Sequence, residues 1–191
     1  MNKSFLIFGT LILSTFCLTA GAAEKDHHKH KKHGKPAADV KVPNQGITLL
    51  RATKGNKVRG VIHLTQTKHG VRLHGKVSGL KPGKHGFHIH QYGDLSATDG
   101  KSAGGHYSPE GHAHGGPDSE EHHAGDLGNI TANSDGVAKV DTMAKGLKLH
   151  FVLGRSIVVH GGKDDLQSQP SGAAGPRVAV GVIGYAQPKS K

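Results

Sequence analysis

The sequence predicts an all-β protein, an antiparallel β-sandwich or barrel with two long functional loops. The 191 residues include 29 glycines and no tryptophan, a composition that favours tight turns between short strands over packed helices. Short segments with two-residue apolar alternation follow one another at close spacing, and no segment has the periodicity of a long amphipathic helix. A chain of this length usually forms one domain around one hydrophobic core.

Residues 1–22 have the three parts of a secretory signal peptide. Lys3 gives a positive start, residues 4–18 form an apolar run, and small residues then allow cleavage after Ala22 or Ala23. The apolar run is too short and too weakly flanked to anchor the chain in a membrane. We therefore expect an exported protein, periplasmic or secreted, with no membrane span.

Removing this segment also removes the only cysteine, Cys17, so the mature chain would contain no disulfide. Cysteine-based zinc sites and cysteine nucleophiles are thereby excluded. The formal charge would fall only from +11 to +10, because one lysine and no acidic residue is lost. The basic residues are scattered and form no nucleic-acid motif, so we expect a small anionic substrate or an anionic surface, and no nucleic acid, to use this charge.

Residues 23–45 are highly charged and lack periodicity, which predicts a disordered tail before a domain at 46–191. Four histidines are dense enough there to bind extra Cu²⁺ or Zn²⁺ loosely: His27, His28, His30 and His33. A solvated tail with little function is the alternative.

The domain contains a series of short strand-like segments. They are residues 57–66, 70–80, 86–90, 136–142, 148–154, 156–160 and 177–186. Two stretches between them, roughly 93–127 and 161–176, are too long to be simple connections, so we expect them to carry function.

The segment GFHIH places two histidines two residues apart. On a strand, His88 and His90 would share one face, while Phe87 and Ile89 would point to the core. Such a pair is half of a copper or zinc site, and His160, at the end of segment 156–160, is placed to supply a third ligand.

The stretch 104–126 holds five histidines and five acidic residues with almost no apolar content. Histidine spacing in a loop is not fixed by secondary structure. The residues alone therefore leave two readings open, a metal site with defined ligands or a second histidine-rich tract like the tail.

Family resemblance separates these readings. GFHIHQYGD, GGHYSPEGHAHGGP, HHAGDLGN, GRSIVVHGGKDDL and GPRVAVGVIG occur in this order, and together they resemble the copper/zinc superoxide dismutase family over roughly residues 48–187. The resemblance implies a Greek-key barrel of about eight strands with one copper and one zinc ion per chain. It also implies a redox cycle that converts superoxide to O₂ and H₂O₂.

The resemblance also implies a role for each site residue. The copper ligands would be His88, His90, His106 and His160, and the zinc ligands His106, His114, His123 and Asp126. His106 would bridge the two ions and carry a proton in the cycle. Asp164 would join a copper ligand to a zinc ligand, Arg177 would draw in superoxide, and His112 and His122 lie off the pattern as exposed residues.

Two features depart from the family or leave alternatives. The family's disulfide between the metal loop and the last strand is absent, with Val180 where a cysteine is expected, a loss of about 2–4 kcal/mol unless other contacts compensate. A copper- or zinc-buffering protein with a dismutase-like domain is therefore the alternative function.

The sequence leaves the oligomeric state open between a homodimer and a monomer. Tyr92 lies where family members often form a dimer contact, but a local packing role for this residue fits equally.

Overall fold

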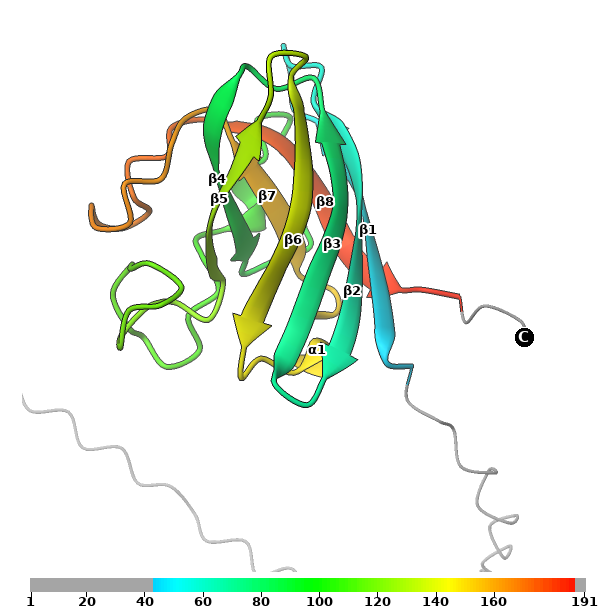
Figure 1. The fold of residues 1–191 in the computed structure, drawn as a ribbon, viewed down its shortest axis with the longest axis vertical. Helices are drawn as coiled ribbons and strands as arrows, with labels where there is room; N and C mark the ends of the chain where they lie inside the picture. The colour runs from blue at the N-terminus through cyan, green and yellow to red at the C-terminus, as the bar shows by residue number, and fades with distance from the viewer. Residues whose placement is uncertain (1–42, 188–191) are drawn as a thin grey trace, which may run out of the picture. The chain divides into compact units, whose positions relative to one another are not determined.

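The computed structural model describes residues 43–187, in which eight antiparallel strands close into a barrel (Figure 1). The predicted signal peptide and nearly all of the predicted tail lie outside the described residues. The strands are β1 (Gln45–Ala52), β2 (Arg59–Thr67), β3 (Gly70–Ser78), β4 (Gly83–His90), β5 (Asp126–Ala132), β6 (Val137–Lys145), β7 (Ser156–His160) and β8 (Arg177–Tyr185). Their order around the barrel, β1-β2-β3-β6-β5-β4-β7-β8, contains the crossovers of a Greek key and confirms the predicted fold class.

Two-residue alternation builds the core as predicted. In β2, Ile62 and Leu64 are fully buried while Val61 and His63 are exposed, because successive side chains of a strand point to opposite faces. Phe87 and Ile89 of β4 also enter the core. The two histidines between and after them, His88 and His90, therefore face the outside of the barrel, where loops cover them.

Three elements differ from the sequence prediction. β1 and β5 were not among the predicted strands; β5 is short and contains Asp126 and Asn129, residue types that disfavour strands. The predicted strand at 148–154 is wrong. That segment forms a short helix, α1 (Leu149–Val152), whose buried Leu149 and Val152 are three residues apart and so fall on one helical face.

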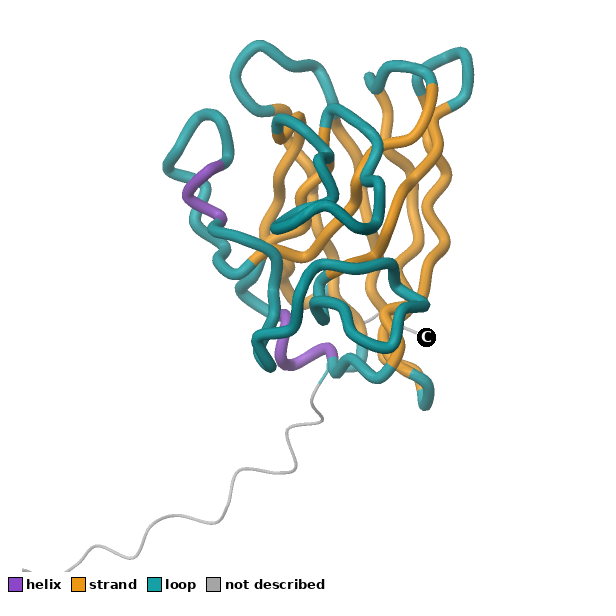
Figure 2. Tube along the Cα trace, turned by 90° about the vertical axis from the view of Figure 1, so that its left-hand side faces the viewer, coloured by secondary structure: helices purple, strands orange, loops and turns teal. Residues whose placement is uncertain are grey.

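Loops 91–125 and 161–176 match the two predicted long loops. They follow β4 and β7, which are neighbours in the barrel, and the first contains a 3₁₀ turn at Lys101–Ala103. Both pass over the outer surface of the strands, as the loop segments in Figure 2 show. The loops and the outer face of β4 and β7 enclose the histidines.

Among the described residues, no helix has both the length and the apolar character needed to cross a membrane.

Candidate metal centre

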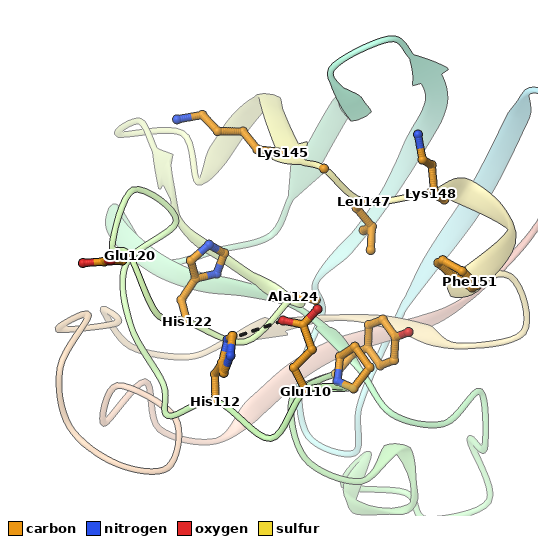
Figure 3. Close-up of a pocket in the computed structure, with 12 residues that line it drawn as sticks. Glu110, His112, Glu120, His122, Ala124, Lys145, Leu147, Lys148 and Phe151 are labelled. Atoms are coloured by element: carbon orange, nitrogen blue, oxygen red, sulfur yellow. Dashed lines mark ion pairs between the residues drawn. The ribbon is translucent and has the colours of Figure 1, made fainter.

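The five histidines of loop 91–125 divide into two groups. His112 and His122 line a cavity of about 520 Å³ whose other walls come from Lys145, Lys148 and Phe151, among others (Figure 3). His112 Nδ1 lies 3.6 Å from a Glu110 carboxylate oxygen. Both rings are partly buried, so the prediction that they are exposed is wrong, but neither belongs to the clusters described next.

The first cluster joins four buried histidines from three parts of the chain. His88 and His90 come from β4, and His160 ends β7. His106 is held beside them because it pairs with His90 in an isolated β-bridge. Each of the four offers a ring nitrogen, and these four nitrogens all lie within 4.8 Å of one another.

The orientation of each ring leaves one nitrogen free to bind a metal. His88 Nε2–H donates to Asp164 Oδ2 at 2.7 Å, His90 Nδ1–H to the Gly104 carbonyl at 2.9 Å, and His160 Nδ1–H to the Gly175 carbonyl at 3.0 Å. Because a neutral imidazole has one donor and one acceptor, these bonds fix the tautomers. The opposite nitrogens, with Nε2 of His106, are buried and have no hydrogen-bond partner. Orphaned acceptors that converge in this way are the signature of a metal site.

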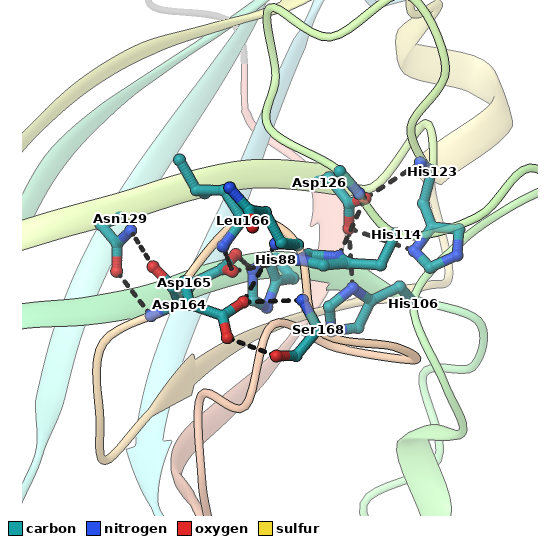
Figure 4. Close-up of polar contacts among 12 residues, drawn as sticks. His88, His106, His114, His123, Asp126, Asn129, Asp164, Asp165, Leu166 and Ser168 are labelled. Atoms are coloured by element: carbon teal, nitrogen blue, oxygen red, sulfur yellow. Dashed lines mark hydrogen bonds and ion pairs between the residues drawn. The ribbon is translucent and has the colours of Figure 1, made fainter.

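The second cluster surrounds the carboxylate of Asp126 (Figure 4). His106 Nδ1 lies 2.7 Å from Oδ1, His114 Nδ1 lies 3.1 Å from Oδ2, and His123 Nδ1 lies 3.2 Å from Oδ1. Three imidazoles and one carboxylate are a ligand set for tetrahedral zinc. His106 belongs to both clusters, with Nδ1 toward the second and Nε2 toward the first.

Asp126 is held in its charged form. Burial raises the pKa of this carboxyl, but hydrogen bonds from His106 and from the backbone N–H of Gly115 outweigh it, and the net pKa is well below the usual value. The backbone N–H of His123 also donates to Asp126 Oδ2, at 2.9 Å. The loop thus folds around an anionic oxygen pair that is ready to accept a cation.

Asp164 connects the two clusters through their outer nitrogens. Its Oδ2 accepts from His88 and its Oδ1 accepts from His114 Nε2 at 3.0 Å, which is the arrangement that the resemblance implies (Figure 4). Asn129 fixes Asp164 in turn, because its side-chain amide exchanges two hydrogen bonds with the Asp164 backbone, each 2.9 Å long. The sequence analysis did not predict this role of Asn129. The only signal for it was its position in β5, a strand that was not recognised.

Two residues of loop 161–176 were also missed. Gln169 exchanges two hydrogen bonds of 2.8 Å with the backbone of His114 and so ties the two long loops together. Gly172 has a φ of +65°, and a Cβ there would lie 1.7 Å from Asp164 Oδ1. Only glycine fits both this backbone conformation and this space.

Arg177 stands beside the first cluster. Its guanidinium donates to the carbonyls of Gly100 and Gly104, and it lines a cavity of about 480 Å³ together with His90, His106 and His160. Burial lowers the pKa of this arginine, which still stays charged because its normal value is 12.5. A small anion that enters the cavity therefore meets one fixed positive charge next to the free histidine nitrogens.

Packing and hydrogen bonds attach loop 91–125 to the barrel where the family's disulfide is missing. Val180, at the position of the expected cysteine, packs with Ala103 and Val158 in a small buried cluster. Arg177 links β8 to two loop carbonyls, as described above. Arg155 stacks 3.8 Å above the centre of the Tyr107 ring, and its side chain donates to the Gln91 carbonyl. These contacts replace one covalent link by several local ones.

Acid should destabilise the metal-free protein. Burial lowers the pKa of His88 to about 4 and that of His160 to about 3, so both rings bind protons more weakly when folded than when unfolded. The stability that this gives the folded state is fully present above the ordinary pKa of 6.5 and is lost as the pH falls. Between pH 7 and pH 4, each of the two histidines should lower the free energy of unfolding by on the order of 3 kcal/mol. Urea unfolding in the presence of a chelator measures this, and a stability that stays level or rises toward pH 4 would contradict it.

The fold and the paired clusters define a β-barrel metalloprotein, and comparison with known proteins specifies its class. The family model for copper/zinc superoxide dismutase (SODC) matches residues 58–183, and the chain belongs to this family. It is an oxidoreductase with copper and zinc as cofactors and superoxide as substrate. The buffering alternative is not favoured.

Two relatives cover most of the chain. It is 43% identical over 200 residues to the extracellular superoxide dismutase [Cu-Zn] of Brugia pahangi, an alignment covering 96% of this chain and 98% of the relative. It is also 43% identical over 174 residues to the extracellular superoxide dismutase [Cu-Zn] of Onchocerca volvulus, with 83% of this chain and 82% of the relative covered.

Proposed function

We propose that the first cluster holds copper and the second holds zinc, one ion of each per chain. The copper ligands are His88, His90, His106 and His160, and the zinc ligands are His106, His114, His123 and Asp126. The observation that carries this assignment is the set of buried, unpartnered ring nitrogens whose opposite nitrogens are oriented by hydrogen bonds. Four imidazole nitrogens suit tetragonal Cu(II), and three imidazoles with a single carboxylate suit zinc in the second set.

The residues around the first cluster divide the catalytic work. Copper, when bound, supplies the one-electron chemistry that oxidises one superoxide and reduces the next. Arg177 attracts the anion and orients it in the cavity, and its charge adds to the positive field of the chain. In the reducing half of the cycle His106 would give up its bond to the metal and hold a proton on Nε2, the nitrogen that faces this cavity. That proton and a second one from water would complete H₂O₂.

Metal content and dismutase activity of two variants test the assignment. His114→Ala should lose zinc, because it removes one of four ligands and one partner of Asp164. His112→Ala is the matched control, since it lies two residues away in the same loop but outside the clusters, and it should retain one copper and one zinc. Equal zinc content in the two variants would contradict the proposed zinc site.

We further propose that the chain is exported through cleavage after Ala22 or Ala23, into the periplasm or the extracellular medium. The signal-like residues 1–22 and the extracellular names of both relatives support this proposal. Mass spectrometry of the mature protein should find an N-terminus at Ala23 or Glu24.

We also propose that the histidines of the tail bind extra Cu²⁺ or Zn²⁺. A deletion of residues 24–40 that leaves total metal binding unchanged would contradict this role.

A homodimer is proposed through an apolar patch on the outer surface of β1, β2 and β8. Leu49 and Val61 are cross-strand partners and both are exposed, as is Val182. A Cβ placed on Gly93 would lie 3.2 Å from Val182, so the exposed Tyr92 adjoins the same patch. Sedimentation should show a dimer that Val182→Asp converts to a monomer, and a monomeric wild-type protein would contradict the proposal.

A further inference from the structure

Two exposed histidines stand side by side on the outer face of the barrel, far from the metal clusters along the sheet. His63 of β2 and His74 of β3 are direct cross-strand partners. Their rings are stacked, with centroids 5.3 Å apart and planes inclined by 25°. In the barrel order, β3, β6 and β5 separate β2 from β4, so this pair is independent of the histidines described above.

A carboxylate extends the row onto a third strand. Asp141 of β6 is the cross-strand partner of His74, so His63, His74 and Asp141 lie in line across three strands. These strands, β2, β3 and β6, lie side by side in Figure 1. Arg72 holds the Asp141 carboxylate with two hydrogen bonds of 2.7 and 2.8 Å. Both oxygens of the Asp141 carboxylate are thus engaged by Arg72, and the ion pair lies on the same outer face as the two imidazoles.

Within residues 43–187 neither ring takes part in a hydrogen bond. Both residues are exposed and their rings stack on each other, so their nitrogens have no protein hydrogen-bond partner. The backbones of β2 and β3 fix the two Cβ atoms at about 4.5–5.5 Å, as in any directly opposed pair. To share one ion, the two rings must turn out of this stack so that one nitrogen of each lies roughly 2.0–2.1 Å from the metal.

We propose that His63 and His74 form a surface chelate for Cu²⁺ or Zn²⁺, a third metal site in the folded domain, beside the Arg72–Asp141 ion pair. The two imidazoles provide half of a tetrahedral or tetragonal ligand set, and water completes it. Binding by a fixed pair exceeds binding by either histidine alone, because the second contact is intramolecular. The site is independent of the proposed ligand roles in the two buried clusters.

Site-resolved nuclear magnetic resonance tests the chelate in the full chain. The protein is loaded with one copper, reduced to the diamagnetic state, and one zinc, and the imidazole ring signals are followed during a titration with Zn²⁺. The signals of His63 and His74 should shift together with a single midpoint. In His74→Gln, the Zn²⁺ concentration for half-saturation at His63 should rise at least tenfold, because only a single ligand remains.

His69→Gln is the matched control, since His69 is also exposed and lies in the turn between the same two strands. This change should leave the midpoint at His63 within twofold of the wild-type value. Histidines of the tail report separately through their own signals. The proposal is overturned if His63 keeps its midpoint in His74→Gln, or if neither ring responds to millimolar Zn²⁺.

Discussion

Replacing Arg177 by alanine should lower the rate constant for superoxide by about 10- to 100-fold at low ionic strength. The wild-type rate should fall steeply as salt is added, because screening weakens the attraction between the anion and the guanidinium. Arg177 is a fixed positive charge in the cavity that His90, His106 and His160 of the first cluster line, and its geometry depends on the carbonyls of Gly100 and Gly104. The variant should therefore also show a weaker salt dependence.

Two further variants separate this local effect from the effect of net charge. Arg59→Ala removes the same charge from an exposed position at the start of β2 and should change the rate less than twofold. Arg177→Lys keeps the charge but loses the planar fork that holds two carbonyls, so an intermediate rate is expected. Stopped-flow decay of superoxide measures all three. An Arg177→Ala protein with full metal content and an unchanged rate would refute the role of this arginine.

Asp164→Asn should weaken zinc binding by about 10- to 100-fold with almost no change in shape. The carboxylate accepts hydrogen bonds from His88 and from His114, one on each oxygen. An asparagine side chain has only one acceptor oxygen, and its amide group would point a donor at the other imidazole. One ring must then lose its orientation, so the copper spectrum should change together with the zinc affinity.

Asp165→Asn is the matched control for this prediction. Asp165 is the next residue, but its side chain accepts only from the backbone and hydroxyl of the same loop and contacts no histidine of the clusters. Zinc affinity, measured by competition with a chelator, should stay at the wild-type level. Equal affinities in Asp164→Asn and Asp165→Asn would show that Asp164 does not orient the ligands.

The sequence predicted the parts of the fold that follow from strand periodicity. Residues 57–66 and 70–80 alternate cleanly because one face of β2 and β3 packs in the core and the other meets solvent. β5 escaped prediction because its residues serve the site as well as the strand; it starts with Asp126 and contains Asn129. The error at 148–154 arose because Leu149 and Val152 suit a strand as well as a single helical turn, and tertiary packing decided between them.

Prediction of the site depended on a different kind of information. The spacing of His88 and His90 placed two candidate ligands on one face without any family knowledge. The histidines of the loop could be distinguished only by resemblance, because loop spacing does not fix distances. The structure brings His106, His114 and His123 around Asp126 and leaves His112 and His122 outside both clusters. Asn129, Gln169 and Gly172 act through backbone contacts, which leave no pattern in a single sequence.

The most direct test of the proposed centre is anomalous X-ray scattering from crystals of the metal-loaded protein, with data collected on both sides of the copper and zinc absorption edges. We expect one copper peak among His88, His90, His106 and His160, and one zinc peak among His106, His114, His123 and Asp126. A copper peak at the zinc ligands, or either metal at His112 and His122 in place of these clusters, would contradict it.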